Sequence, residues 1–444
     1  MNEKTFYNWS RHFRCTPQRL HRPCSEAEIV DVMMDISRRA AHARVFGSGF
    51  SPGDIAMSDE DLVLLTNLDR VLDIDTDAAT VVVEPGVTLE RLSYELAARG
   101  LALPVLGSVA GQTVAGAVGT GTHGTGVKFG TLSSLVQAMR VVTPNGDLLN
   151  ISAEENAELL HAARCHLGSL GMISRITLQV CEAFDLEVTE QPNTLEAVLA
   201  NLPERLRSDH YRFWYVPHTD RVWEWMATRI SPGPIPRPPG PWQRLNTWFN
   251  EKVIDHHVYE SLLHLATYRP SLIPIINKTG ALARFNSIRH SKGPSFEQFT
   301  FDCLFKQHVN EWSIPLEHTA EALRGLRELI ARKGYYAHLP IEVRFVRGDD
   351  IWLSPCQGRD SCYIGVIAYM PHGKPPRHEA YFADFERLMM RFDGRPHWGK
   401  FFKPDHEELA RRYPHWEAFQ RVRRRLDPDY RLRNAFTERV FCGN

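Results

Sequence analysis

Residues 107–126 read GSVAGQTVAGAVGTGTHGTG, and seven of these twenty residues are glycines. Glycine adopts positive φ easily and lets backbone N–H groups approach an anion closely. A shorter run of the same character, FGSGFS, occupies residues 46–51. Two such segments in one half of a chain indicate a long ligand whose pyrophosphate lies between two subdomains. The alternative is a pair of glycine-rich turns that bind nothing.

Neither glycine-rich segment has the spacing of the common nucleotide-binding loops. Neither contains G-x-G-x-x-G in a βαβ unit with a following acidic residue, and neither contains G-x-x-x-x-G-K-[ST]. The sequence therefore disfavours a Rossmann domain and a P-loop.

Composition excludes several classes of protein. Lys and Arg total 52 against 53 Asp and Glu, so no net field attracts nucleic acid or an acidic membrane. The eight cysteines form no C-x-x-C pair, which argues against a zinc site or a disulfide framework. The first residues, MNEKTFYNWSRHF, contain no apolar signal segment, and the most apolar stretch, 261–275, is too short and polar to span a bilayer. We expect a cytoplasmic protein without a metal site or membrane span.

The first 180 residues alternate between strand and helix patterns. Ser25 and Glu28 have capping-box spacing at the start of a helix over 25–39. ARVF at 43–46 and MISRITLQV at 172–180 predict strands, and 71–86 predicts a hairpin. Two further helices are predicted, one opened by Thr88 and one opened by Ser152 with Glu155. The fold class predicted is α+β.

The second half of the chain has a different texture. Segments 307–315, 341–346 and 362–370 predict strands of a second sheet. SPGPIPRPPGPW at 231–242 holds six prolines and predicts a surface loop. A basic run near the C-terminus predicts a solvated helix face and contains Arg421, Arg423, Arg424 and Arg425.

Several long motifs resemble a known family. VFGSGFSPGDIA, NLDRVLDID, VEPG, LGSVAGQTVAGAVGTGTHGTG and HLGSLGMI resemble the FAD-binding domain of the vanillyl-alcohol-oxidase flavoprotein superfamily. RFWYVPHTDRV, FKQHVNEWSIP, IEVRFVRGDDIWLSPCQGRDSCY, GRPHWGK and LDPDYRLRNAF resemble the sugar-1,4-lactone oxidases, most of all the L-gulono-1,4-lactone oxidases among them. The resemblance covers nearly the whole chain.

The resemblance implies three parts. Residues 1–182 would form a two-subdomain FAD-binding domain of PCMH type, and 183–394 an α+β cap domain with an antiparallel sheet that binds the substrate. Residues 395–444 would return to the flavin site. The cofactor-binding residues implied are Val45, Phe46, Gly47, Ser48, Gly49, Phe50, Ser51, Gly107, Ser108, Thr113, Gly116, Thr120, Gly121, Thr122, His123 and Ile173.

Phe50 departs from the family pattern. In covalent members the turn reads GSGHS or GGGHS, and the histidine is bonded to the flavin 8α-methyl group. Phenylalanine has no nucleophilic atom, so the resemblance implies FAD held without a covalent bond, with the Phe50 ring packed against the flavin edge.

Three charged residues are candidates for catalysis. Glu342 and Arg344 lie two apart on a predicted strand, so both side chains face the same way. On the sequence alone, a surface ion pair is an equal alternative. The resemblance implies that Glu342 and Arg344 bind the sugar and that Lys400, in HWGK, lies near the flavin pyrimidine. His397 and Trp398 are expected to be structural.

The reaction implied is oxidation of an aldono-1,4-lactone by hydride transfer to flavin N5, with L-gulono-1,4-lactone to L-ascorbate as the first choice. Oxygen would be reduced to hydrogen peroxide, because Gly107 stands where dehydrogenase members carry alanine. Three alternatives stay open: an alditol oxidase, whose members also read HWGK, a lactone dehydrogenase using a quinone or cytochrome, and a flavin-binding protein without catalysis.

Overall fold

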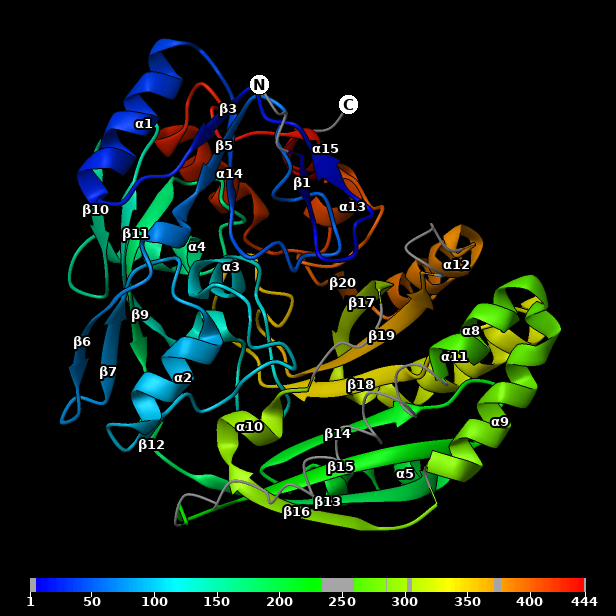
Figure 1. The fold of residues 1–444 in the computed structure, drawn as a ribbon. Helices are drawn as coiled ribbons and strands as arrows, with labels where there is room; N and C mark the ends of the chain where they lie inside the picture. The colour runs from blue at the N-terminus through cyan, green and yellow to red at the C-terminus, as the bar shows by residue number, and fades with distance from the viewer. Residues whose placement is uncertain (1–4, 234–258, 285, 302–305, 371–376, 443–444) are drawn as a thin grey trace.

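The computed structural model describes residues 5–233, 259–284, 286–301, 306–370 and 377–442. Helices and sheets are mixed along the described chain, which confirms the α+β class. Figure 1 shows the N-terminal segments (blue and cyan) and the C-terminal helices (red) in one half, and a large sheet in the other. The proline-rich loop predicted at 231–242 falls largely outside the described residues.

A small parallel sheet begins the fold. Its strand order is β3-β5-β4, with bounds Arg19–His21, Asp61–Leu64 and Ala43–Phe46, so the strand predicted at 43–46 is confirmed. Helix α1 (Glu26–Arg38) begins where the sequence predicts, since the Ser25 side chain accepts a hydrogen bond from the Glu28 N–H. Its apolar stripe is buried and holds Ile29, Met33 and Ile36.

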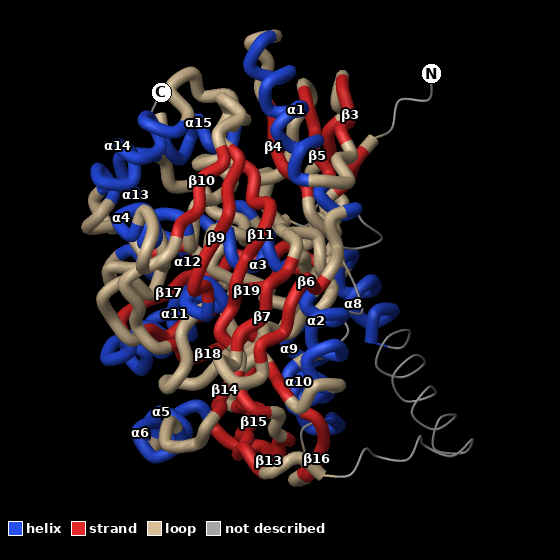
Figure 2. Tube along the Cα trace, turned by 90° about the vertical axis from the view of Figure 1, so that its left-hand side faces the viewer, coloured by secondary structure: helices blue, strands red, loops and turns tan. Residues whose placement is uncertain are grey.

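A five-stranded antiparallel sheet follows, visible in Figure 2. Its order is β10-β9-β11-β7-β6, with bounds Leu148–Ile151, Val136–Val142, Met172–Gln179, Thr80–Val83 and Val71–Asp75. The predicted hairpin is confirmed by the antiparallel pairing of β6 with β7. Helices α2 (Leu89–Ala97), α3 (Val114–Gly119) and α4 (Ala157–Ala163) belong to the same part of the chain.

The helix predicted to open at Ser152 begins later. The Ser152 hydroxyl accepts from the N–H groups of Glu154 and Glu155, which makes a local turn. Asn156 is then left-handed, with φ 53°, so α4 begins only at Ala157. The predicted start was wrong because the serine caps its own turn and not the helix.

The large sheet has eight strands in the order β16-β13-β15-β14-β18-β19-β17-β20, paired antiparallel throughout. The bounds in that order are Arg289–Pro294, Asp185–Thr194, Arg221–Ile230, His210–Tyr215, Ile341–Val346, Ser361–Tyr369, Gln307–Pro315 and Arg395–Pro396. The strands predicted at 307–315 and 341–346 are confirmed. One face packs on α11 (Thr319–Lys333) and α12 (Glu379–Met390) through an apolar core that includes Phe213, Val343 and Ile364.

Short elements complete the described chain: β1 (Phe6–Tyr7), β2 (Arg14–Cys15), β8 (Leu101–Ala102), β12 (Cys181–Glu182), α5 (Leu195–Ala200), α6 (Leu202–Arg205), α8 (Tyr259–Tyr268), α9 (Ile273–Arg284), α10 (Ser295–Phe299), α13 (His406–Ala410), α14 (Trp416–Leu426) and α15 (Ala435–Phe441). The basic run lies on α14, and Arg421, Arg424 and Arg425 are exposed as expected. The prediction of a solvated position was wrong for Arg423. Its side chain is buried against Tyr430 and Phe441 and donates a hydrogen bond to Gln420.

The C-terminal segment packs back on the first sheets. Ala43 N–H donates to the Arg431 carbonyl, and the Asn434 side chain donates to the carbonyls of Asp54, Ile55 and Met57. Figure 1 shows α13, α14 and α15 beside the N-terminal strands. The domain boundaries after residues 182 and 394 stay a prediction.

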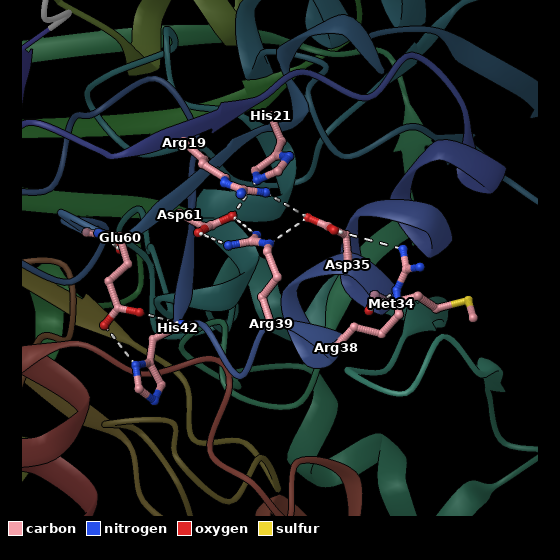
Figure 3. A network of polar contacts seen from close by, with 10 residues as sticks. Arg19, His21, Met34, Asp35, Arg38, Arg39, His42, Glu60 and Asp61 are labelled. Carbon is pink, nitrogen blue, oxygen red and sulfur yellow. Dashed lines mark hydrogen bonds and ion pairs between the residues drawn. The ribbon is translucent and has the colours of Figure 1, made fainter.

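A buried carboxylate joins the parallel sheet to α1 (Figure 3). Asp61, 2% exposed, lies 2.5 Å from His21 Nε2 and accepts from the Arg39 guanidinium. Arg39 also pairs with Asp35 at 2.8 Å. A buried carboxylate that loses its cation is costly, so this network fixes α1 on the sheet edge.

We predict that Asp61→Asn destabilises the protein by about 2–3 kcal/mol, because Arg39 and His21 lose the charge that they share. The matched control is Asp69→Asn. Asp69 pairs with Arg91 at 2.8 Å, but both side chains are nearly half exposed. The control should change stability by no more than about 1 kcal/mol. Thermal unfolding followed by circular dichroism checks both, and equal midpoints would contradict the structural role of Asp61.

Candidate functional site

The face of the large sheet opposite α11 and α12 carries two rows of side chains. Residues directly opposite one another in paired strands point to the same face. One row contains Trp214, Glu342, Gly365 and Glu311, and the next contains Arg212, Arg344, Tyr363 and Ser313. The polar side chains of β14, β18, β19 and β17 are therefore neighbours through strand register, although they come from distant parts of the sequence.

Glu342 and Arg344 form a close ion pair within this face. The guanidinium Nη2 of Arg344 donates to Glu342 Oε1 at 2.6 Å and also contacts the Ser108 hydroxyl. Trp214 Nε1 donates to the same carboxylate at 3.3 Å. Only 7% of the Arg344 side chain and 18% of the Glu342 side chain are exposed, so this is not a surface ion pair.

The charge of Glu342 is set by its neighbours. Burial alone would raise the pKa of Glu342, but Arg344, followed by Arg212, lowers it below its ordinary value. The carboxylate is therefore ionised at neutral pH and accepts hydrogen bonds.

Arg212 adds a second buried cation that the sequence did not single out. Its guanidinium donates to Ser108 at 3.2 Å and lies over the rings of Trp225 and Phe301. Burial, reinforced by the charge of Arg344, lowers its pKa to about 10, so it still carries its proton at neutral pH. In the sequence, the only indication that Arg212 belongs to this face is its spacing of two residues from Trp214, which puts both side chains on the same side of a strand.

Lys400 lies at the edge of the same face. Its Nζ is 3.6 Å from Glu311 Oε2, and 28% of its side chain is exposed. The HWGK segment is fixed to β17, because the His397 N–H donates to the Glu311 carbonyl. It also packs against the chain just after the first glycine-rich segment, since a Cβ built at Gly53 would lie 3.1 Å from the Lys400 carbonyl oxygen. Trp398 is structural as expected, being fully buried and bonded to the Leu353 carbonyl.

A pocket runs between the parallel sheet and the second glycine-rich segment. It is lined by many of the residues expected to bind a cofactor: Val45, Phe46, Gly47, Ser48, Gly49, Phe50, Ser51, Thr113, Gly116, Thr120 and Ile173. Gly49 has φ +70°, and a Cβ there would lie 2.8 Å from the Phe46 ring. A Cβ at Gly47 would lie 2.5 Å from Thr113 Oγ1. Gly47 is thus needed for the close approach of the two walls, and Gly49 for the left-handed turn that folds over Phe46.

The other residues expected at the cofactor are not among those that line this pocket: Gly107, Ser108, Gly121, Thr122 and His123. Ser108 joins Arg344 and Arg212, as described above. Gly107 and Thr122 face each other, because a Cβ at Gly107 would lie 3.4 Å from Thr122 Cγ2. His123 is buried and stacks on Tyr363 with ring centroids 3.7 Å apart, and Gly121, with φ +66°, lies near Cys165. Their roles toward a cofactor stay a prediction.

Phe50 lines the pocket and meets the second glycine-rich segment. A Cβ at Gly111 would lie 2.9 Å from the Phe50 ring. The ring therefore packs directly against the backbone of Gly111, and any residue with a side chain at position 111 would displace it. The turn that carries Phe50 is held by the N-terminal segment. Trp9 N–H donates to the Gly49 carbonyl, and the Asn8 side chain donates to the carbonyls of Ser51 and Pro52.

Two pocket residues give independent evidence for a ligand. His166 is 3% exposed, and neither ring nitrogen has a hydrogen-bond partner among the described residues. Burial, together with Arg44, lowers its pKa to about 4, so it offers one donor and one acceptor. Arg44 is also buried and donates only to main-chain carbonyls, including those of Leu167 and Leu432. A buried imidazole with no hydrogen-bond partner, beside a buried guanidinium that forms no ion pair among the described residues, suits a polar, anionic ligand.

Comparison with known proteins shows to which family the chain belongs. A model of the D-arabinono-1,4-lactone oxidase family matches residues 176–440, and a model of the FAD-binding domain matches residues 17–152. The L-gulonolactone oxidase of Bos taurus is 39% identical over 438 residues, covering 98% of both chains. This chain belongs to the sugar-1,4-lactone oxidase family. The resemblance read from the motifs is thereby confirmed.

Other relatives widen the picture. The L-gulono-1,4-lactone dehydrogenase of Mycobacterium tuberculosis is 36% identical and covers 98% of both chains. Among solved structures, cholesterol oxidase from B. sterolicum aligns with a TM-score of 0.78 at 15% identity, covering 98% of this chain and 96% of that one. At that identity the likeness concerns the fold alone, and it supports the predicted architecture.

The protein is accordingly an FAD-dependent oxidoreductase that acts on sugar lactones, and the alternative of a binding protein without catalysis is set aside. The glycine-rich lining of the pocket, with the buried Arg44 and His166, suits the anionic pyrophosphate of FAD. None of the described helices is long and apolar enough to cross a bilayer. The expected cytoplasmic location stays a prediction.

Proposed function

We propose that the protein oxidises L-gulono-1,4-lactone at C2, giving the 2-keto lactone that enolises to L-ascorbate, with oxygen as the acceptor. The observation that carries this proposal is the buried Glu342–Arg344 pair, which contacts Ser108 of the glycine-rich segment. This pair offers a sugar an anionic acceptor and a cationic donor at the edge of the cofactor domain. The bovine relative, named for the same lactone, supports the choice of substrate.

FAD, when bound, supplies the acceptor for the hydride that leaves C2. The chain's own groups bind and orient the lactone. The ionised Glu342 accepts hydrogen bonds from sugar hydroxyls, and Arg344 holds the reacting oxygen through its fixed guanidinium. Ser108, which accepts from Arg212, also contacts Arg344. Lys400 would add positive charge near the pyrimidine of bound FAD.

The competing acceptor is a quinone or a cytochrome, because the Mycobacterium tuberculosis relative is named a dehydrogenase. An alditol is the competing substrate, because this chain reads HWGK. One experiment separates these possibilities. A panel of aldonolactones and alditols should be assayed both with oxygen and with an artificial dye. Preference for an alditol, or turnover with dye alone, would contradict the proposal.

We predict that Arg344→Ala slows anaerobic reduction of the cofactor by L-gulono-1,4-lactone about 10²–10³-fold, because one preorganised charge-stabilising donor is lost. Arg344→Lys should recover part of the rate, because the lysine ammonium keeps the positive charge but lacks the planar, multi-donor guanidinium. Stopped-flow absorbance measures the step directly. The matched control is Arg347→Ala, because Arg347 is exposed just beyond β18. A normal rate in Arg344→Ala would place the active site elsewhere.

FAD should be bound without a covalent bond, because Phe50 offers no nucleophilic atom at the turn. Acid precipitation is expected to leave the yellow colour in the supernatant. Flavin retained by the washed pellet would refute this. Phe50→His tests whether position 50 faces the cofactor. An imidazole ring there would enter the same side of the pocket and could restore an acid-stable bond to the flavin.

Gly107 should control access of oxygen. An added methyl group would lie 3.2 Å from the His123 carbonyl oxygen and 3.4 Å from Thr122 Cγ2, so it fits after a shift of a few tenths of an ångström. We expect hydrogen peroxide from the native protein, and slower reoxidation by oxygen in Gly107→Ala with dye reduction unchanged. Equal oxygen rates in the two proteins would remove this role from Gly107.

A further inference from the structure

We infer that Glu311 is a positioning residue, which holds the ammonium group of Lys400 beside the cofactor with the help of His123 and His397. The inference rests on the proposed placement of Lys400 at the flavin and extends it. It concerns a buried carboxylate that the proposed reaction does not otherwise use.

The register of the sheet gives Glu311 its place. Glu311 on β17 and Glu342 on β18 are both paired with Gly365 on β19, so the two carboxylates face each other across a residue that has no side chain. A Cβ at Gly365 would lie 3.6 Å from Glu311 Cγ. Each carboxylate has its own cation: Arg344 pairs with Glu342, and Lys400 pairs with Glu311.

The two histidines complete the surroundings of Glu311. His123 Nε2 lies 3.5 Å from Glu311 Oε1, and its Nδ1 lies 2.9 Å from the Gly124 carbonyl oxygen. His397 Nδ1 accepts from the Gly399 N–H at 3.0 Å, which leaves its proton on Nε2. One nitrogen from each ring and a Glu311 oxygen lie within 4.8 Å of one another. The positive charge that balances Glu311 in this cluster is the ammonium group of Lys400.

The charge states agree with this geometry. Burial alone would raise the pKa of Glu311, but Lys400, followed by His123, lowers it well below its ordinary value. Burial lowers the pKa of His397 to about 3, so that ring is neutral at ordinary pH. Glu311, only 6% exposed in its side chain, is thus an ionised carboxylate whose desolvation is offset by Lys400.

Lys400 needs such a partner. Its main chain is fixed, because its N–H donates to the His397 carbonyl and the His397 N–H donates to the Glu311 carbonyl. Its side chain is a flexible stem with a strongly hydrated head, and it is partly exposed. Without the Glu311 charge, the ammonium would turn toward water and away from the cofactor.

Sulfite binding tests this inference, because sulfite bleaches the flavin absorbance and binds more tightly when positive charge lies near the pyrimidine ring. The FAD-loaded protein should be titrated as the native form, Glu311→Gln, Lys400→Met and the double variant. We expect each single variant to weaken sulfite binding about tenfold, and the double variant to be no weaker than Lys400→Met alone. Glu311→Asp, which keeps the charge on a shorter stem, should be intermediate.

The matched control is Glu386→Gln. Glu386 is another buried glutamate, bonded to Asn310 from α12, and its loss should leave sulfite binding unchanged. If Glu311→Gln strengthens binding by the same factor with and without Lys400, Glu311 is only a nearby negative charge and the inference is overturned. An unchanged affinity in Glu311→Gln overturns it as well.

The titration needs no sugar, so its outcome is separate from the substrate proposed above. If Lys400→Met leaves sulfite binding unchanged, the placement of Lys400 at the flavin is itself wrong, and the inference falls with it. If Lys400→Met weakens binding and Glu311→Gln does not, the proposed site survives and only the role of Glu311 is lost.

Discussion

Charged side chains buried on one face of an otherwise apolar sheet are the constraint on which this structure depends. A lone charge in that position would be costly in free energy, so each charged group must have an oppositely charged partner at ion-pair distance. Glu342 is matched by Arg344, and Glu311 by Lys400. Because these partners come from β18, from β17 and from the loop after β20, the charges are compensated only when the strands are in register and the chain beyond residue 395 has returned. The same constraint that raises the cost of misfolding gathers Glu342, Arg344 and Glu311 on one face of the sheet, the face proposed to bind the sugar.

The opposite face of the sheet makes this arrangement possible. Phe213, Val343 and Ile364 alternate with the polar rows and pack under α11 and α12, so the strands are fixed by an apolar core that the active face does not supply. On the cofactor side, Arg44 has a comparable role. Its guanidinium bonds to carbonyls of Leu167 and Leu432, which ties the loop before β11 and the C-terminal segment to β4. Rigid elements thus surround a site whose own side chains are polar.

Sequence reasoning succeeded where the signal was local. The alternation of IEVRFV put Glu342 and Arg344 on one strand face, and the structure removes the alternative of a surface pair, since both are largely buried. The partners Arg212 and Glu311 were missed, because only strand register, which is a long-range property, brings them to that face. Arg423 shows the same limit: its burial depends on Tyr430 and Phe441, which lie outside its own helix.

Phe50 links the two glycine-rich segments and explains why neither can be understood alone. The ring occupies the space left by the missing side chain of Gly111, and the turn beneath it is held by Asn8 and Trp9 from the N-terminal segment. A histidine bonded to the cofactor would fix this edge of the pocket covalently, whereas the turn that carries Phe50 is fixed by packing and by hydrogen bonds to main-chain carbonyls. If FAD is held without a covalent bond, as proposed, its retention depends on contacts spread over the turn, the second glycine-rich segment and the N-terminal residues, together with the imidazole of His166, which lines the same pocket and has no hydrogen-bond partner among the described residues.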